Sequence, residues 1–216
     1  MAVIAAEWRK LGLPGIWLVA ALTVAGSWAL AALMPGPGGS AQTLQLVPSL
    51  TAMGCILLGV LAATGEYSGR QVATTCTAMP RRFPVAVAKA LTATAVLTVT
   101  AMLAAGGVRL LVPEGEWALP WVVAHLAAMG LLGYAIGLVA RQLVASLTTA
   151  LILLVVAGPV LRPYTELATW LPGSVGADLF APDPVHPLAE SAGALAGWVL
   201  GFWVIAAVAW VQRDTR

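Results

Sequence analysis

The sequence predicts an all-α membrane protein that crosses the bilayer six times and keeps both termini in the cytoplasm. Hydrophobic residues make up 60% of the 216 residues and charged residues only 9%, whereas water-soluble domains carry about 25% charged residues. From Leu11 to Gly65 the chain contains no Asp, Glu, Lys or Arg, and four more long uncharged runs follow. Each of these four runs is close to the ~20 apolar residues that a helix needs to cross about 30 Å of hydrocarbon.

The first uncharged run is too long for one helix, and the Pro- and Gly-rich stretch 35–40 divides it. We expect a single transmembrane domain over residues 1–216, whose six spans use the chain and leave no room for a soluble catalytic domain. The expected spans cover about residues 16–34, 44–64, 85–112, 117–140, 143–161 and 191–211. The start of the chain also resembles a signal peptide with a cleavage site near residues 29–32, but the topology favours a retained first span.

The distribution of charge orients these spans. With the N-terminus in the cytoplasm, nine of the eleven Lys and Arg residues fall on the inner side, and only Arg109 and Arg162 fall outside. Six acidic residues fall outside and three inside. Because Lys and Arg concentrate in cytoplasmic loops, this asymmetry predicts that both termini face the cytoplasm.

Several kinds of chemistry have no residues to support them. No expected span carries Asp, Glu, Lys or Arg near its middle, which disfavours a secondary carrier driven by protons or sodium ions. His125 lies inside a span, where a lone histidine is more typical of a hydrogen-bonded packing residue than of a proton relay. His186 has no second ligand nearby, so no metal site is expected, and Cys55 and Cys76 form no disulfide framework.

The sequence also lacks the common motifs of catalytic sites. The sequence contains no Gly-x-x-x-x-Gly-Lys-Ser/Thr loop for phosphates, no Gly-x-Ser-x-Gly elbow and no His-Glu-x-x-His pair. We therefore expect no enzymatic activity and no cofactor in this chain. The energy for any driven process would come from another polypeptide.

A polar, cationic segment lies between expected spans two and three, and it is the only sizeable surface that the chain offers to a soluble partner. Residues 65–82 read GEYSGRQVATTCTAMPRR. Ser68 can cap a short helix and Pro80 would end it. On composition alone, an ordinary solvated loop whose arginines bind lipid phosphates remains open.

The order of residues in this segment resembles the first cytoplasmic loop of type-2 ABC exporter permeases. A glutamate and a tyrosine leave span two, a short helix with threonines follows, and Pro-Arg-Arg leads into span three. Four other stretches also resemble the family, and they are Glu-Trp-Arg-Lys-Leu at 7–11, the Gly-x-x-x-Gly-x-x-x-Arg pattern at 133–141, Leu-Pro at 171–172 and Arg-Asp at 213–214. The sequence departs from the family at 69–71, where many members carry a Gly-Thr pair.

This resemblance implies the permease subunit of an ATP-driven exporter in a bacterial plasma membrane. Its substrate would be amphipathic or hydrophobic, such as a drug, antibiotic, peptide or lipid. Its partners would be a second permease chain, identical or different, membrane lipid and separate ATPase subunits that bind ATP and Mg²⁺, with no nucleic acid. The residues that couple the chain to the ATPase would be Glu66, Tyr67, Arg70, Thr74, Thr75, Pro80, Arg81 and Arg82. The alternative is a non-transporting membrane sensor or immunity protein that signals through the same loop.

Glycines recur every four residues in two of the expected spans. Gly133 and Gly137 form such a ridge in span four, and Gly193, Gly197 and Gly201 form another in span six. Small residues at this spacing let helix backbones approach closely. We favour packing within the six-helix bundle over a dimer interface, because the family places other spans, one, two and five, around its central axis.

The outer segment 162–190 between spans five and six is acidic but also carries apolar residues such as Tyr164, Leu171 and Phe180. A simple exposed loop would not need them. We therefore predict a re-entrant or interfacial structure, whose backbone must be shielded by protein or face a water-filled cavity. In the resembling family this region forms short helices that dip into the outer leaflet and cover the exit.

Overall fold

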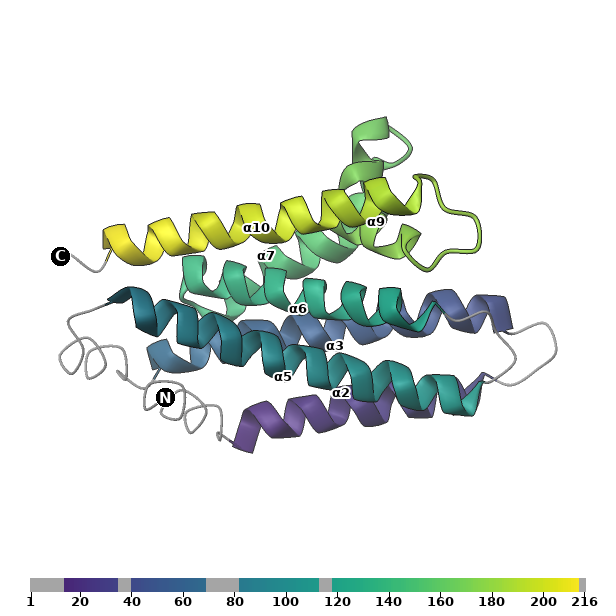
Figure 1. Ribbon diagram of the computed structural model, residues 1–216, viewed down its shortest axis with the longest axis horizontal. Coiled ribbons are helices and arrows are strands. Elements are labelled where there is room, and N and C mark those ends of the chain that lie inside the picture. Colours follow the sequence, from purple (N-terminus) through teal and green to yellow (C-terminus); the bar gives the residue numbers. More distant parts are fainter. Residues whose placement is uncertain (1–13, 35–39, 69–81, 113–117, 214–216) are drawn as a thin grey trace.

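The computed structural model describes residues 14–34, 40–68, 82–112 and 118–213, and within these ranges it contains helices and no strands (Figure 1). Six helices are long and apolar enough to cross a membrane, and they are Gly15–Leu33, Gln45–Gly65, Ala90–Leu111, Leu119–Ala140, Leu143–Leu161 and Leu188–Ala209. The predicted helical class and number of spans are confirmed, and the architecture is that of a multi-pass membrane protein.

The helices extend beyond the apolar runs that predicted them. They are α2 (Pro14–Leu33), α3 (Ser40–Ser68), α5 (Arg82–Leu111), α6 (Leu119–Ala140), α7 (Leu143–Leu151) with η1 (Ile152–Val156) and α8 (Ala157–Leu161), and α10 (Leu188–Arg213). Thus α3, α5 and α10 each begin three or four residues earlier than expected. Hydropathy marks only the part of a helix inside the hydrocarbon, whereas the helix itself continues into the headgroup layer.

The helices run roughly side by side, so the bundle has two ends. We call the end where α2 begins and α10 ends the terminal end, and the opposite end the distal end (Figure 1). The α6–α7 turn lies at the terminal end, where Arg141 adopts a left-handed conformation with φ of 58° and its amide donates to the Gly137 carbonyl. This cap reverses the chain between two spans with almost no loop.

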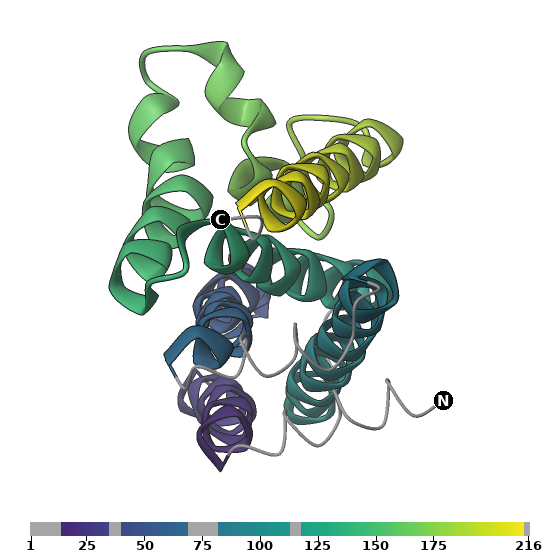
Figure 2. The ribbon, with the colours of Figure 1, turned by 90° about the vertical axis from the view of Figure 1, so that its left-hand side faces the viewer.

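Helices α3 and α6 form the centre of the bundle, with α2 and α5 on one side and α7 and α10 on the other (Figure 2). The two central helices touch through glycine: Gly59 lies against the Gly130 carbonyl oxygen, and a methyl group on Gly133 would lie 2.7 Å from the Ile56 carbonyl oxygen. On Gly137 it would lie 2.6 Å from the Cβ of Ala63. Gly133 and Gly137 therefore do pack within the bundle.

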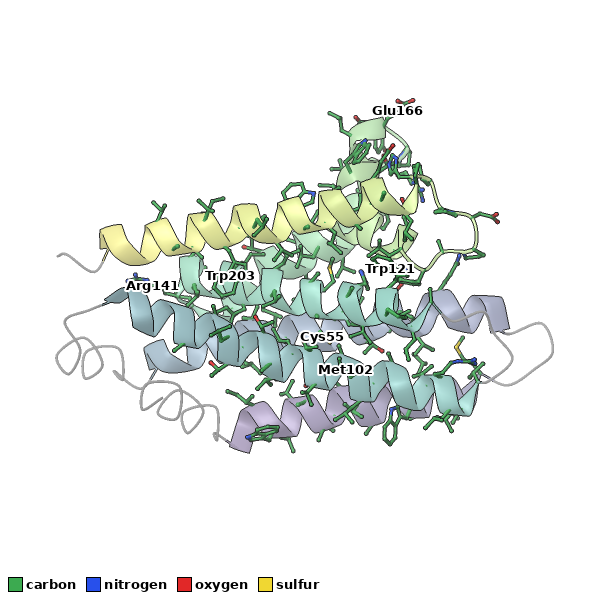
Figure 3. The ribbon with its side chains drawn as sticks, viewed as in Figure 1. Cys55, Met102, Trp121, Arg141, Glu166 and Trp203 are labelled. Carbon is green, nitrogen blue, oxygen red and sulfur yellow. The ribbon has the colours of Figure 1, made fainter. Side chains whose placement is uncertain are left out.

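The glycines of α10 do not pack against the other helices, so the expectation that they pack within the bundle is corrected. A methyl group on Gly193, Gly197 or Gly201 would meet no atom within 4 Å, and only 11% of this span is buried. Instead α10 contacts α6 through aromatic rings, because Trp203 stacks on Tyr134 with 5.6 Å between the ring centroids (Figure 3). The glycine ridge of α10 faces away from the other helices of the chain.

Five buried hydroxyl groups within the spans are satisfied by their own helices, whereas the buried Ser191 hydroxyl of α10 has no partner among the described residues. Thr51, Thr64, Thr92, Thr100 and Ser146 each donate a hydrogen bond to the carbonyl oxygen four residues earlier. In hydrocarbon an unpaired polar group is costly, and this local bond removes that cost without a neighbouring helix.

Candidate functional site

The two ends of the proposed coupling segment lie at the terminal end of the bundle. Glu66 and Tyr67 occupy the last turn of α3, and Arg82 is the first residue of α5. Arg70, Thr74, Thr75, Pro80 and Arg81, and with them the expected short coupling helix, lie outside the described residues. The coupling role of this segment stays a prediction.

The outer segment folds into two short helices at the distal end. A 3₁₀-helix, η2 (Glu166–Trp170), is followed by α9 (Pro172–Asp178), which begins with proline at its first position. Glu166 lies on the part that projects from the bundle (Figure 3). Val175 of α9 is fully buried and belongs to the same core cluster as Leu126 and Met129 of α6. Helix α9 is therefore packed into the bundle, whereas the part around Glu166 projects from it.

Helix α9 reaches well below the distal end of α6. Its Gly176 contacts the ring of His125, six residues after the start of α6, and approaches Met129 four residues further on. With 1.5 Å of rise per residue, these contacts lie about 9 to 15 Å along α6. This depth fits the predicted re-entrant structure. Helix α9 is also shielded by α6 and α10, as such a structure requires.

Glycine lets α9 enter this space. A methyl group on Gly173 would overlap the carbonyl oxygen of Leu154 in η1, and one on Gly176 would overlap the His125 ring. Ser174 of α9 donates a hydrogen bond to the Ala168 carbonyl at 3.0 Å, which ties α9 to η2. The π-helical turn η1 interrupts span five at the level of this contact, and such turns often mark functional sites.

A cavity of about 590 Å³ lies between α9 and the spans at the distal end, and we call it the distal cavity. One face of α3 supplies Gln45, Ser49, Ala52 and Ile56, spaced so that one residue per turn points to the same side. From Gln45 to Ile56 the cavity follows α3 for about 16 Å, or roughly half of the hydrocarbon thickness. The other walls are His125 and Met129 of α6, residues of η1 and α8, and the segment from Gly173 to Val185.

The lining of the distal cavity changes from charged to apolar with depth. Arg162, Asp178 and Asp183 line it at the outer segment, whereas Ile56, Met129 and Leu154, all buried, line it inside the bundle. One oxygen of Asp178 accepts a hydrogen bond from the Val185 amide at 3.3 Å, which fixes this carboxylate. The cavity thus offers a polar rim and an apolar interior, as small-molecule sites usually do.

His125 is the polar side chain deepest in the distal cavity. It is 3% exposed, and its ring lies 5.2 Å from the ring of Phe180, between centroids. Packing was expected, but the expected hydrogen bond is absent at one nitrogen, since Nδ1 has no partner among the described residues. A buried nitrogen without a partner costs about 1–3 kcal/mol. This nitrogen lies against Gly176 and is covered by α9.

His186 has a structural role in the outer segment. Its ring lies 4.1 Å from that of Trp170, between centroids, and its Nε2 is 3.0 Å from the Thr169 hydroxyl. Within the described part of the chain, no group of three or more His, Cys, Asp and Glu side chains could hold a metal ion.

The sequence carries a signal for the distal cavity. Gln45, Ser49 and His125 are polar residues within long apolar runs, and the first two are one helical turn apart. That spacing places them on one face of α3. The part played by Asp178 and Asp183 could not be read in the same way, because it depends on how the outer segment folds back.

Comparison of the sequence with protein-family models and with curated proteins finds no match in either set. The interpretation of the distal cavity therefore depends on its geometry and on the residues that line it.

Proposed function

We propose that this chain is the permease subunit of an ATP-driven exporter of amphipathic or hydrophobic molecules. The observation that carries the proposal is the distal cavity. Its lining extends from the distal end to Ile56 of α3 and Met129 of α6, about halfway along the bundle and close to the contact of Gly59 with Gly130. A half-channel that opens to one side of the membrane is what alternating access requires of a transporter.

The predicted orientation gives this half-channel a direction. The basic residues place the terminal end in the cytoplasm, so the distal cavity would open to the outside. Release to the outside is the last step of export. The outer segment, with α9 seated beside His125, would line the route by which substrate leaves.

The energy would come from separate ATPase subunits, because the sequence has no phosphate-binding loop with its lysine. Residues 66–82 would form the contact with the ATPase, as the resemblance to type-2 ABC exporter permeases implies. Both helices that flank this segment, α3 and α5, meet the terminal end, so a push there would act directly on two spans. One of them, α3, supplies a wall of the distal cavity.

The test is purification of the chain from its own cells under mild conditions, followed by identification of the proteins that accompany it. We expect an ATPase subunit in stoichiometric amount, and ATP-driven uptake of a fluorescent amphipathic dye into inverted vesicles that contain both proteins. The control is an ATPase in which alanine replaces the phosphate-loop lysine, which should abolish uptake. A chain that purifies without any ATPase and moves no dye would favour the sensor or immunity alternative.

A further inference from the structure

The outer segment gives the distal cavity an electrostatic preference. Residues 162–190, all described, carry four carboxylates and one guanidinium, so the formal charge of this segment is −3. Two of the carboxylates, Asp178 and Asp183, line the cavity together with Arg162. A rim with an excess of negative charge beside low-dielectric walls attracts cations and repels anions.

The interior of the cavity selects for an apolar body. The lining includes the apolar residues Val155, Pro159, Phe180 and Val185, which are half-buried or exposed, and Phe180 adds an aromatic face next to His125. A purely inorganic cation would gain nothing from these walls, whereas an apolar molecule would remove their surface from water.

We propose that the distal cavity binds an amphipathic organic cation, whose positive charge lies at the Asp178 and Asp183 rim and whose apolar body contacts Val155, Pro159 and Phe180. The volume of about 590 Å³ accommodates one such molecule. This inference names the class of ligand that the distal cavity of the proposed permease would bind. It rests on the proposed function only for the transport of that ligand after it has bound. Binding itself needs neither ATP nor an ATPase.

The first test compares two ions of nearly the same shape and opposite charge. The full chain is purified in lipid nanodiscs, and equilibrium dialysis measures radiolabelled tetraphenylphosphonium and tetraphenylborate, with empty nanodiscs as the blank. We expect saturable binding of tetraphenylphosphonium, at least about tenfold tighter than that of tetraphenylborate. Absence of saturable binding, or equal affinity for both ions, would overturn the proposal.

The second test distinguishes the effect of the two carboxylates at the cavity rim from the effect of the overall charge of the segment. Asp178→Asn combined with Asp183→Asn should weaken tetraphenylphosphonium binding about tenfold or more, because two nearby charges are lost. Asparagine at 178 retains an oxygen for the Val185 amide. The matched control is Glu166→Gln combined with Glu190→Gln, which removes the same charge from exposed residues of the same segment that do not line the cavity. Equal weakening by both pairs would show a diffuse field and no site.

The third test fills the cavity. Ala181→Phe places a large side chain in the lining, whereas Ala189→Phe places it at an exposed position on the first turn of α10. We expect the first variant to lose at least tenfold in tetraphenylphosphonium affinity and the second to bind as the unmodified chain does. Unchanged binding by a folded Ala181→Phe protein would contradict the proposal, and the charge variants decide the matter if this protein fails to fold. Because no ATPase is present, failure here leaves the proposed export function standing, and failure of export leaves a binding result intact.

Discussion

At the scale of single residues, glycine allows the two central helices to touch. Gly59 of α3 lies against the Gly130 carbonyl oxygen of α6, so a side chain at position 59 has no space. Gly59→Ala should therefore push the two central helices apart and destabilise the protein by about 1–3 kcal/mol. Thermal or denaturant unfolding of the purified protein in detergent would measure this change.

The matched control is Gly197→Ala on α10, where the added methyl group meets no atom within 4 Å. We expect its stability to stay within about 0.5 kcal/mol of the unmodified chain. If both alanines destabilised the protein equally, the contact between α3 and α6 would not be as close as the structure has it.

These glycines also show how far the sequence could predict packing. The four-residue spacing is the same in α6 and α10, yet Gly133 lies against Ile56 whereas Gly193, Gly197 and Gly201 face away from the protomer. Spacing indicates which face of a helix allows close approach, but not whether a neighbour lies there. Gly59 and Gly130 were missed because neither belongs to a four-residue glycine ridge, although they make the closer contact. His125 was correctly expected to pack, but its missing Nδ1 partner depends on α9, whose position the sequence did not fix.

At the scale of elements, the outer segment is held by α10. The indole Nε1 of Trp198 donates a hydrogen bond to the Trp170 carbonyl oxygen at 2.8 Å, which joins α10 to the end of η2, next to α9. The apolar residues of the segment predicted that it would not be a simple exposed loop. They could not predict this anchor, since its partners are 28 residues apart in the chain.

Trp198→Phe removes this hydrogen bond and keeps an aromatic ring. The loss of one such bond is worth about 0.5–1.5 kcal/mol, so we expect amide hydrogen exchange in 166–178 to become about two- to tenfold faster. Exchange in the centre of α3 and α6 should not change, because the variant leaves their contact intact. Trp17→Phe on α2, where the side chain is 47% exposed, is the control. Uniformly faster exchange throughout the bundle would indicate global destabilisation instead of a loosened outer segment.

At the scale of the whole molecule, the fold gives the arrangement of the spans but the membrane decides their direction. The structure places the start of α2, the end of α10 and the turn at Arg141 at one end of the bundle. That much agrees with an even number of spans predicted from hydropathy. Which end faces the cytoplasm depends on the charges of the loops and on the machinery that inserts them, so it was predicted from basic residues alone.

Reporter tags test this direction. Tags at the N-terminus, near Met79 and at the C-terminus should react as cytoplasmic, and a tag near Gly38 should react as external, because nine of the eleven basic residues would then lie inside. Labelling of intact and permeabilised cells with a membrane-impermeant reagent would distinguish the two sides. An external C-terminus would contradict the six-span topology, and an inverted pattern would turn the distal cavity toward the cytoplasm and so argue against export.

The proposed coupling to an ATPase would connect the two ends of the molecule, and Glu66 at the end of α3 is its sharpest probe. Glu66→Ala removes a negative charge from the expected inner side, so it cannot weaken the orientation set by basic residues. If Glu66 is half of a charge pair at the ATPase contact, its loss should reduce export about tenfold or more, with insertion and abundance near normal. Asp214→Ala is the matched control, because it removes the same charge from the same expected side but outside the segment 66–82.

Two further changes test the rest of the coupling segment. Thr75→Arg adds a bulky charge to its middle, and Pro80→Ala removes the residue that would end its short helix. Both should lower ATP-driven export and leave tetraphenylphosphonium binding unchanged, because the distal cavity lies at the other end of the bundle. If export survived these two variants and Glu66→Ala, the segment 66–82 would be an ordinary solvated connection, and force from an ATPase would have to enter through another part of the chain.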